Sequence, residues 1–194
     1  MRVRGVHGSI IAGVLLLAFL SAGDVGAAPV KYKRTKESYN VPPVTLVNQD
    51  GKKVDLQELL LRSKKPVLLD FVYATCTTIC PILSVGFSNF QKELGKEAGN
   101  VALVSISIDP DNDTPPVMKE YLKRYGARPG WDFLTGKRED IVAVMKAFDS
   151  YVVNKMNHYP VTILRGPGEA SWVRIYGLLG TADLMEEYRK VKGQ

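Results

Sequence analysis

The sequence predicts a single α/β domain in which helices flank a central mixed β-sheet. Beyond residue 43, apolar runs of strand length alternate with segments of helical periodicity, which is the pattern of an α/β fold. Two strands late in the chain follow each other across a short turn, so we expect them to pair antiparallel and to make the sheet mixed. The length of 194 residues suits one domain, and 45% apolar with 24% charged residues excludes a wholly disordered chain.

The N-terminal segment has the order of a secretory signal peptide over residues 1–28. Two arginines precede an apolar run over residues 10–20, and small residues follow up to a predicted cleavage after Ala27 or Ala28. The apolar run is shorter than the roughly 20 residues that span a bilayer. An uncleaved N-terminal anchor, with membrane association, is the alternative. We expect the protein to be periplasmic or otherwise extracytoplasmic, where thiols can be oxidised.

A polar, basic stretch and a hairpin come next. Residues 29–43 end in VPP and predict a flexible leader. Its basic cluster KYKRTK is typical of a solvated tail, and contact with acidic lipid is the alternative. No basic stripe interleaved with aromatic residues follows, so we do not expect nucleic-acid binding. Residues 44–60 alternate apolar and polar positions about the turn NQDG, which indicates an N-terminal hairpin extension.

The first long strand and the first long helix are predicted on either side of the two cysteines. Residues 65–74, KPVLLDFVYA, form a continuous apolar run, the pattern of a strand buried on both faces. A helix is predicted after Cys80, with Pro81 in its first turn, where the missing N–H costs no hydrogen bond. Its apolar positions recur at helical spacing: Leu83, Phe87, Phe90 and Leu94.

The second half of the chain continues the alternation. Residues 100–109 predict another buried strand. A helix over 113–126 follows, capped by Asp113 or Thr114 and stopped by Gly126. The remaining predicted elements are a strand over 131–136, a helix over 138–152, a hairpin over 161–177 and a helix over 181–193 capped at Thr181.

Cys76 and Cys80, the only cysteines of the chain, lie where the first long strand passes into a helix. That position is at the carboxyl end of the sheet, where open α/β sheets usually bind ligands. A purely structural disulfide would close too short a loop to stabilise the fold much. A redox pair is chemically available, because helix amides beside Pro81 favour a thiolate at Cys80 and Cys76 can form a disulfide with it.

A metal site is the third interpretation, and it requires a further ligand. Beyond the predicted signal peptide, which contains His7, the chain has one histidine, His158, directly before the late hairpin. A lone histidine is more often a surface residue, but this loop can lie beside the loop that carries the cysteines. Structural zinc usually takes four ligands, and catalytic zinc would need a general base that is not obvious. Thiolates select Cu(I), and an added imidazole also accommodates Cu(II). We therefore predict one copper ion, Cu(I) or Cu(II), bound by Cys76, Cys80 and His158.

Three segments together resemble the Sco/SenC family of copper chaperones, which have a thioredoxin-like fold. They are DFVYATCTTICP at residues 70–81, SISIDPDNDTP at 105–115, and WDFLTG at 131–136 followed by the histidine before the hairpin. The resemblance covers roughly residues 40–190 and implies that residues 44–194 form a thioredoxin-like Sco domain. It also implies that Cys76, Cys80 and His158 are the copper ligands, whereas Asp109 shapes its loop.

The function implied by the resemblance is delivery of copper to the dinuclear copper site of cytochrome c oxidase, or reduction of the cysteines of that site. The implied partners are the copper-accepting subunit of the oxidase and a thiol reductant, and the protein is expected to be a monomer. Pro160 departs from the family pattern and resembles the cis-proline that faces the dithiol in thioredoxins. The alternative is therefore a thiol-disulfide oxidoreductase or redox sensor that uses Cys76 and Cys80 without copper.

Overall fold

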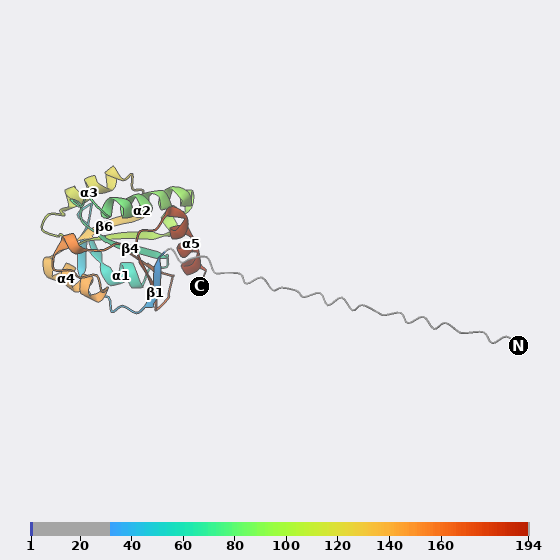
Figure 1. The fold of residues 1–194 in the computed structure, drawn as a ribbon. Coiled ribbons are helices and arrows are strands. Elements are labelled where there is room, and N and C mark those ends of the chain that lie inside the picture. The colour runs from blue at the N-terminus through green and yellow to red at the C-terminus, as the bar shows by residue number, and fades with distance from the viewer. Residues whose placement is uncertain (2–31, 194) are drawn as a thin grey trace. The chain divides into compact units, whose positions relative to one another are not determined.

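A computed structural model describes residues 32–193 together with Met1, and these residues contain an eight-stranded sheet flanked by helices (Figure 1). The strand order is β1-β8-β7-β4-β5-β6-β2-β3. The strands are β1 (Lys33–Glu37), β2 (Thr45–Asn48), β3 (Lys53–Asp55), β4 (Val67–Val72), β5 (Ala102–Ser107), β6 (Trp131–Thr135), β7 (Val161–Arg165) and β8 (Trp172–Tyr176). The helices are α1 (Leu56–Leu61), α2 (Cys80–Leu94), α3 (Pro115–Arg124), α4 (Arg138–Ala147) and α5 (Thr181–Lys192), with the 3-10 helices η1 (Gly95–Asn100) and η2 (Lys155–Asn157). The predicted mixed α/β fold is confirmed.

Strand β4 divides the interior into two cores. It lies between β5, which is parallel to it, and β7, which is antiparallel, and all six of its residues are buried. Leu68 and Val72 pack on one face with α2, α3 and α5, whereas Leu69 and Phe71 pack on the other face with α1 and α4. Figure 1 shows α2 and α3 on one side of the sheet and α1 and α4 on the other. The apolar run without alternation is explained by this burial on both faces.

The strand directions place three loops at one edge of the sheet. Strands β4, β5 and β6 are parallel, so their carboxyl ends meet at that edge. Strand β7 runs antiparallel to β4, so the residues that precede it lie at the same edge. The loop after β4 carries Cys76, the loop after β5 carries Asp109, and the loop before β7 carries His158. This topology brings Cys80 and His158, which are 78 positions apart in the sequence, into one neighbourhood.

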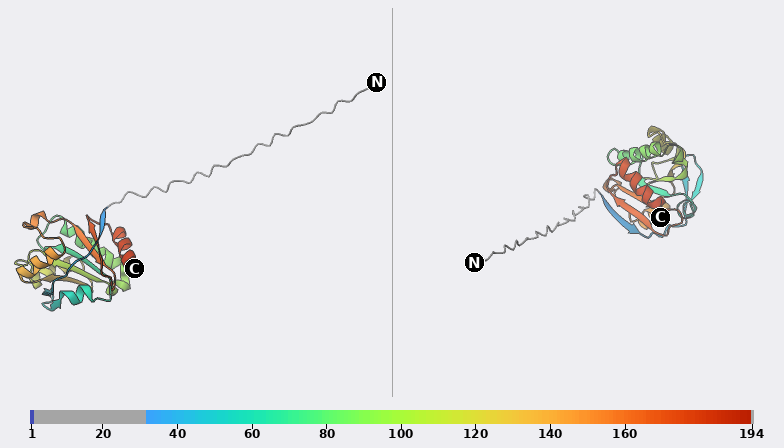
Figure 2. Two further views of the ribbon diagram at one scale, coloured as in Figure 1. Left: turned by 90° about the horizontal axis from the view of Figure 1, so that it is seen from below. Right: turned by 90° about the vertical axis from the view of Figure 1, so that its right-hand side faces the viewer.

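The predicted leader over residues 29–43 is wrong where residues 33–37 form strand β1. This strand pairs antiparallel with β8 along the edge of the sheet, as Figure 2 shows in blue beside the late hairpin. Helix α5 also holds strand β1 in place, because the buried carboxylate of Glu187 accepts hydrogen bonds from Tyr32 and Arg34 at 2.9 and 2.8 Å. A charged strand at an edge resists further pairing, and its charges made it look like a solvated tail in the sequence.

Two helix boundaries also differ from the predicted ones. Helix α4 ends at Ala147 instead of residue 152, because Asp149 has a φ of 49° and cannot continue a right-handed helix. Helix α5 has Gly180 at its N-cap, so Thr181 is already helical and caps nothing. The hairpin over 44–60 is confirmed as β2 and β3, and its last residues form α1.

The predicted signal peptide over residues 1–28 lies outside the described residues, apart from Met1. Within the part of the chain that the structure describes, no helix has the length and apolar character needed to cross a membrane.

Candidate metal centre

The two cysteines lie at the start of helix α2, just beyond the carboxyl end of strand β4. Residues 73–79 turn between the strand and the helix, and the backbone N–H of Cys76 donates to the carbonyl of Tyr73 at 3.1 Å. Cys80 is the first residue of α2, and Pro81 follows it in the first turn, as predicted. Both cysteines are buried and both are free thiols. The strand and the helix therefore fix the positions of the two sulfur atoms.

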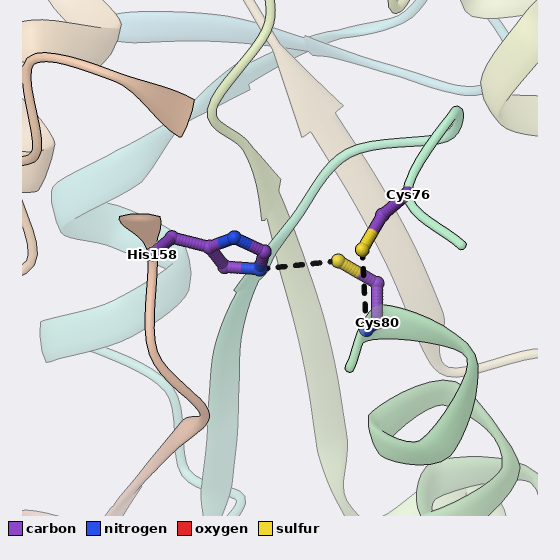
Figure 3. A group of neighbouring side chains, drawn as sticks. All are labelled: Cys76, Cys80 and His158. Carbon is purple, nitrogen blue, oxygen red and sulfur yellow. Dashed lines mark hydrogen bonds between the residues drawn. The ribbon is translucent and has the colours of Figure 1, made fainter. Parts of the chain in front are cut away.

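His158 reaches the cysteines from the loop before strand β7. Its Nδ1 lies 2.9 Å from the carbonyl oxygen of Lys155, and because a carbonyl only accepts, Nδ1 carries the proton. Its Nε2 is then an acceptor, 3.2 Å from Sγ of Cys80 (Figure 3). One donor atom from each of Cys76, Cys80 and His158 lies within 4.8 Å of the others. The structure thus brings together the three residues that the sequence singled out.

The imidazole is in the form that binds metals. Burial lowers the pKa of His158, and the hydrogen bond with the Lys155 carbonyl offsets only part of that effect. The ring is therefore neutral at neutral pH, and Nε2 offers its lone pair. A backbone carbonyl that fixes the other ring nitrogen is the usual support of a histidine ligand. Two sulfur atoms and one imidazole nitrogen form a soft donor set, which suits copper better than magnesium or calcium.

The two thiols differ in acidity, and the predicted thiolate at Cys80 is wrong. Burial alone would raise the pKa of Cys76, but hydrogen bonds from the Cys80 thiol and from the N–H groups of Thr78 and Cys80 outweigh it and lower that pKa to about 7. Burial raises the pKa of Cys80, and the neighbouring Cys76 raises it further. The reason is geometric, because the backbone N–H of Cys80 points at Sγ of Cys76, 3.5 Å away. The start of the helix stabilises the thiolate of the preceding cysteine.

We expect Cys76 to be alkylated well before Cys80 in the metal-free reduced protein. Its rate with iodoacetamide should rise as the pH passes through about 7, because the thiolate is the nucleophile and its fraction grows there. Peptide mass mapping after short reaction times measures both sites. The variant C80S should keep the fast phase and C76S should lose it. Faster labelling of Cys80 in the parent protein would contradict this assignment.

The loop after β5 holds both ligand-bearing loops in place. The buried carboxylate of Asp113 accepts hydrogen bonds from the backbone N–H of Ala74 at 3.1 Å and from the hydroxyl of Ser107 at 2.5 Å. Asp109 pairs with the ammonium group of Lys155 at 2.5 Å, in the turn that leads to His158. Asp109 therefore shapes its surroundings and lies outside the cluster of three donor residues. One loop fixes the distance between the cysteines and the histidine.

Sequence reasoning missed four supporting residues around the cluster. The rings of Tyr73 and His158 form a T-shaped contact with centroids 5.3 Å apart, and the hydroxyl of Thr78 lies 3.6 Å from Sγ of Cys76. Asp113 was expected only as a possible helix cap, and Lys155 was not singled out at all. The spacing of Asp109 and Asp113 in DPDND could have indicated a structural role for Asp113, whereas no sequence pattern near Lys155 indicates its role. The peptide bond of Pro160 is trans, unlike the thioredoxin proline that it was compared with.

Comparison with known proteins places this site in a family. The sequence profile of SCO1/SenC matches residues 33–187. A SCO1 protein homolog of Bacillus subtilis is 36% identical over 118 residues, which are 59% of this chain and 60% of that protein. Among solved structures, BsSco, described as a member of the Sco family of cytochrome c oxidase assembly proteins, is 30% identical with a TM-score of 0.65, over 79% of this chain and 94% of that one.

A copper-bound relative has the same fold. The structure of Bradyrhizobium japonicum ScoI with copper bound is 27% identical, with a TM-score of 0.63, over 78% of this chain and 98% of that one. The predicted thioredoxin-like Sco fold is thereby confirmed. The chain spans about three fifths of the length of the Bacillus protein. Because the family profile covers most of the chain, including the strands and loops that carry Cys76, Cys80 and His158, this protein belongs to the SCO1/SenC family.

Proposed function

We propose that this protein binds one copper ion through Cys76, Cys80 and His158 and passes it to a protein partner outside the cytoplasm. The observation that carries the proposal is the cluster itself, in which three soft donor atoms lie within 4.8 Å of one another. Thiolates and an imidazole suit both oxidation states of copper. The copper-bound Bradyrhizobium relative supports the choice of metal.

The proposed acceptor is the dinuclear copper site of cytochrome c oxidase. The description of BsSco as a member of a family of oxidase assembly proteins supports this choice. Three ligands leave copper with an open coordination position, so a cysteine of the acceptor can bind before the donor ligands leave. His158 is the ligand best placed to leave first, because it is carried by a loop that is only partly buried, whereas Cys80 is fixed in α2. Transfer would then proceed by exchange of ligands, without free copper.

Reduction of the acceptor's cysteines is the second candidate function, and the acidity of Cys76 favours it. A pKa of about 7 leaves a large thiolate fraction at neutral pH, next to a buried Cys80 that stays protonated. The Cys76 thiolate would attack the partner's disulfide, and Cys80 would then displace the partner. The partner disulfide gains two electrons, and Cys76 and Cys80 become a disulfide. Both activities use the same thiols, and only copper binding uses His158.

The variant H158A separates the two functions. We expect copper affinity to fall by about a hundredfold, since even residues that merely support a metal ligand are worth 10–100-fold. Thiol-disulfide exchange should stay within about twofold of the parent protein, because Cys76 and Cys80 remain. Competition with a chromophoric copper chelator measures the first quantity, and reduction of a small disulfide measures the second. The exposed neighbour variant N157A is the control and should change neither. Unchanged copper affinity in H158A would refute the proposed ligand set.

A further inference from the structure

Met156 is an exposed methionine beside the cluster of Cys76, Cys80 and His158. It lies in η2, two residues before His158, and 64% of it is exposed. By contrast, Met118, Met145 and Met185 are buried in the two cores. Burial of apolar surface therefore does not explain its place. Its sulfur is nevertheless held in position, because the hydroxyl of Tyr73 donates a hydrogen bond to Sδ at 3.3 Å.

Tyr73 connects the thioether of Met156 with the cluster. Its ring forms a T-shaped contact with the ring of His158, and the ammonium group of Lys155 lies 5.1 Å from its centroid. Tyr73 therefore contacts His158 through its ring and holds Sδ of Met156 through its hydroxyl. A soft sulfur atom is thus kept at the solvent side of the site.

The thioether sulfur of Met156 is a suitable donor atom for Cu(I). Methionine sulfur is a neutral, polarisable donor, and together with cysteine it selects Cu(I) among the biological metals. The side chain has three rotatable bonds, so its sulfur can turn away from the Tyr73 hydroxyl. Its neutrality means that it adds no charge to a site with two thiols. A donor of this kind favours monovalent copper and gives little to divalent copper.

We propose that Met156 is a fourth, exchangeable ligand for Cu(I) at the exposed side of the Cys76–Cys80–His158 cluster. This inference rests on the proposed copper-binding function and adds the residue that discriminates between the oxidation states. Met156 binds while copper is held and returns to Tyr73 when an acceptor cysteine takes its place. The exposed side of the cluster is then also the side at which the acceptor arrives.

The variant M156L tests the inference, because leucine keeps the apolar volume and removes the sulfur. We expect its Cu(I) affinity to fall about tenfold and its Cu(II) affinity to stay within twofold of the parent. The reduction potential of the bound copper should accordingly fall by about 59 mV, the one-electron equivalent of a tenfold change. X-ray absorption should show one sulfur ligand fewer on Cu(I). The control is V153A, which alters an exposed apolar residue of the same loop that has no donor atom and should change none of these quantities.

Two outcomes would overturn the inference. One is a Cu(I) affinity in M156L equal to that of the parent protein. The other is an equal loss of Cu(I) and Cu(II) affinity, which would indicate a distorted loop. H158A, measured in the same assay, separates this inference from the proposed function. If H158A loses affinity and M156L does not, only the role of Met156 is refuted. If H158A retains full affinity, the proposed copper site itself fails.

Discussion

Replacing Asp70 with asparagine should stabilise the folded protein by about 4 kcal/mol above pH 7, and by much less in acid. Asp70 lies in the middle of β4 and is completely buried. Neither oxygen of its carboxyl group has a hydrogen-bond partner among the described residues. Burial raises the pKa of Asp70 to about 7, and its neighbour Ser105 on β5 offsets only part of that rise.

The direction of the pH dependence follows from the two pKa values of Asp70. The unfolded chain loses this proton near the ordinary value of 3.8, whereas the folded chain keeps it up to about 7. Between these values the unfolded state binds fewer protons, so the free energy of unfolding falls as the pH rises. The loss is complete above about pH 7. The interval of roughly three pKa units gives the expected 4 kcal/mol, at about 1.4 kcal/mol per unit.

Urea unfolding of the parent protein and of D70N at about pH 5 and about pH 8 measures this effect, and the change in their difference is the quantity to compare. Glu187 supplies a control of opposite sign. Its buried carboxylate accepts three hydrogen bonds, and although burial alone would raise its pKa, these bonds lower it. The stability that Glu187 adds is present above its unfolded pKa of 4.5 and is lost below it. E187Q should therefore cost nearly the same at about pH 5 and about pH 8, and less only when the measurement is extended to about pH 3. An equal gain for D70N at both pH values would refute the buried-carboxyl explanation.

The elements that the sequence predicted well are those that depend on local patterns. The apolar run of β4 has no alternation because both of its faces are covered, and Pro81 fits only the first turn of α2. Once β4 and β7 were expected in one sheet, the position of His158 before β7 indicated an encounter with the cysteines. The ligand cluster was therefore accessible from the order of the elements.

The features that the sequence could not supply depend on contacts between distant segments. Strand β1 forms because β8 offers a free edge and Glu187 neutralises Arg34, and neither partner lies near it in the chain. The acidity of Cys76 depends on the direction of one backbone N–H at the start of α2. Asp70 stands inside an apolar run, and the neighbouring sequence does not indicate whether a hydrogen-bond partner faces its carboxyl group. Such effects appear only when the strands and helices are assembled.

Replacing Arg174 with methionine should lower the free energy of unfolding by about 3 kcal/mol. Arg174 lies on β8, is 1% exposed, and donates to the carbonyl oxygens of Phe148 and Asp149 at 2.5 and 3.1 Å, just after the end of α4. Each carbonyl keeps a second donor without Arg174, the hydroxyl of Ser150 for Phe148 and that of Tyr159 for Asp149. The expected loss is therefore that of the hydrogen bonds from a charged group, which are worth about 1.5–3 kcal/mol each. The guanidinium also compensates the negative end of the helix dipole. The variant R174K keeps the positive charge but has fewer hydrogen-bond donors, so its free energy of unfolding should fall by less than that of R174M.

Arg165 provides the matched comparison for Arg174. It is also buried in the sheet, on β7, but among the described residues it donates to one backbone carbonyl, that of Leu60, at 3.0 Å. Burial lowers the pKa of Arg165, whereas in Arg174 the hydrogen bond and charge of Tyr39 outweigh burial and raise it. R165M should therefore cost only about 1 kcal/mol. Urea unfolding followed by tryptophan fluorescence measures both variants. If R174M and R165M lost the same free energy of unfolding, the additional carbonyl contacts of Arg174 would contribute nothing to stability.

The effect of Arg174 should extend to the metal centre without any contact to it. The same guanidinium donates to the hydroxyl of Tyr159 at 3.1 Å, and that hydroxyl donates to the carbonyl of Asp149 at 2.8 Å. Tyr159 directly follows His158, so loss of Arg174 removes one of the two hydrogen bonds of the Tyr159 hydroxyl and loosens the histidine loop at that end, while Lys155 still holds the other end. Copper affinity of R174M, measured where the variant is fully folded, should therefore fall about tenfold, as expected for a residue that positions a metal ligand. R165M should leave copper affinity unchanged, because the loop contacts of His158 are intact in that variant.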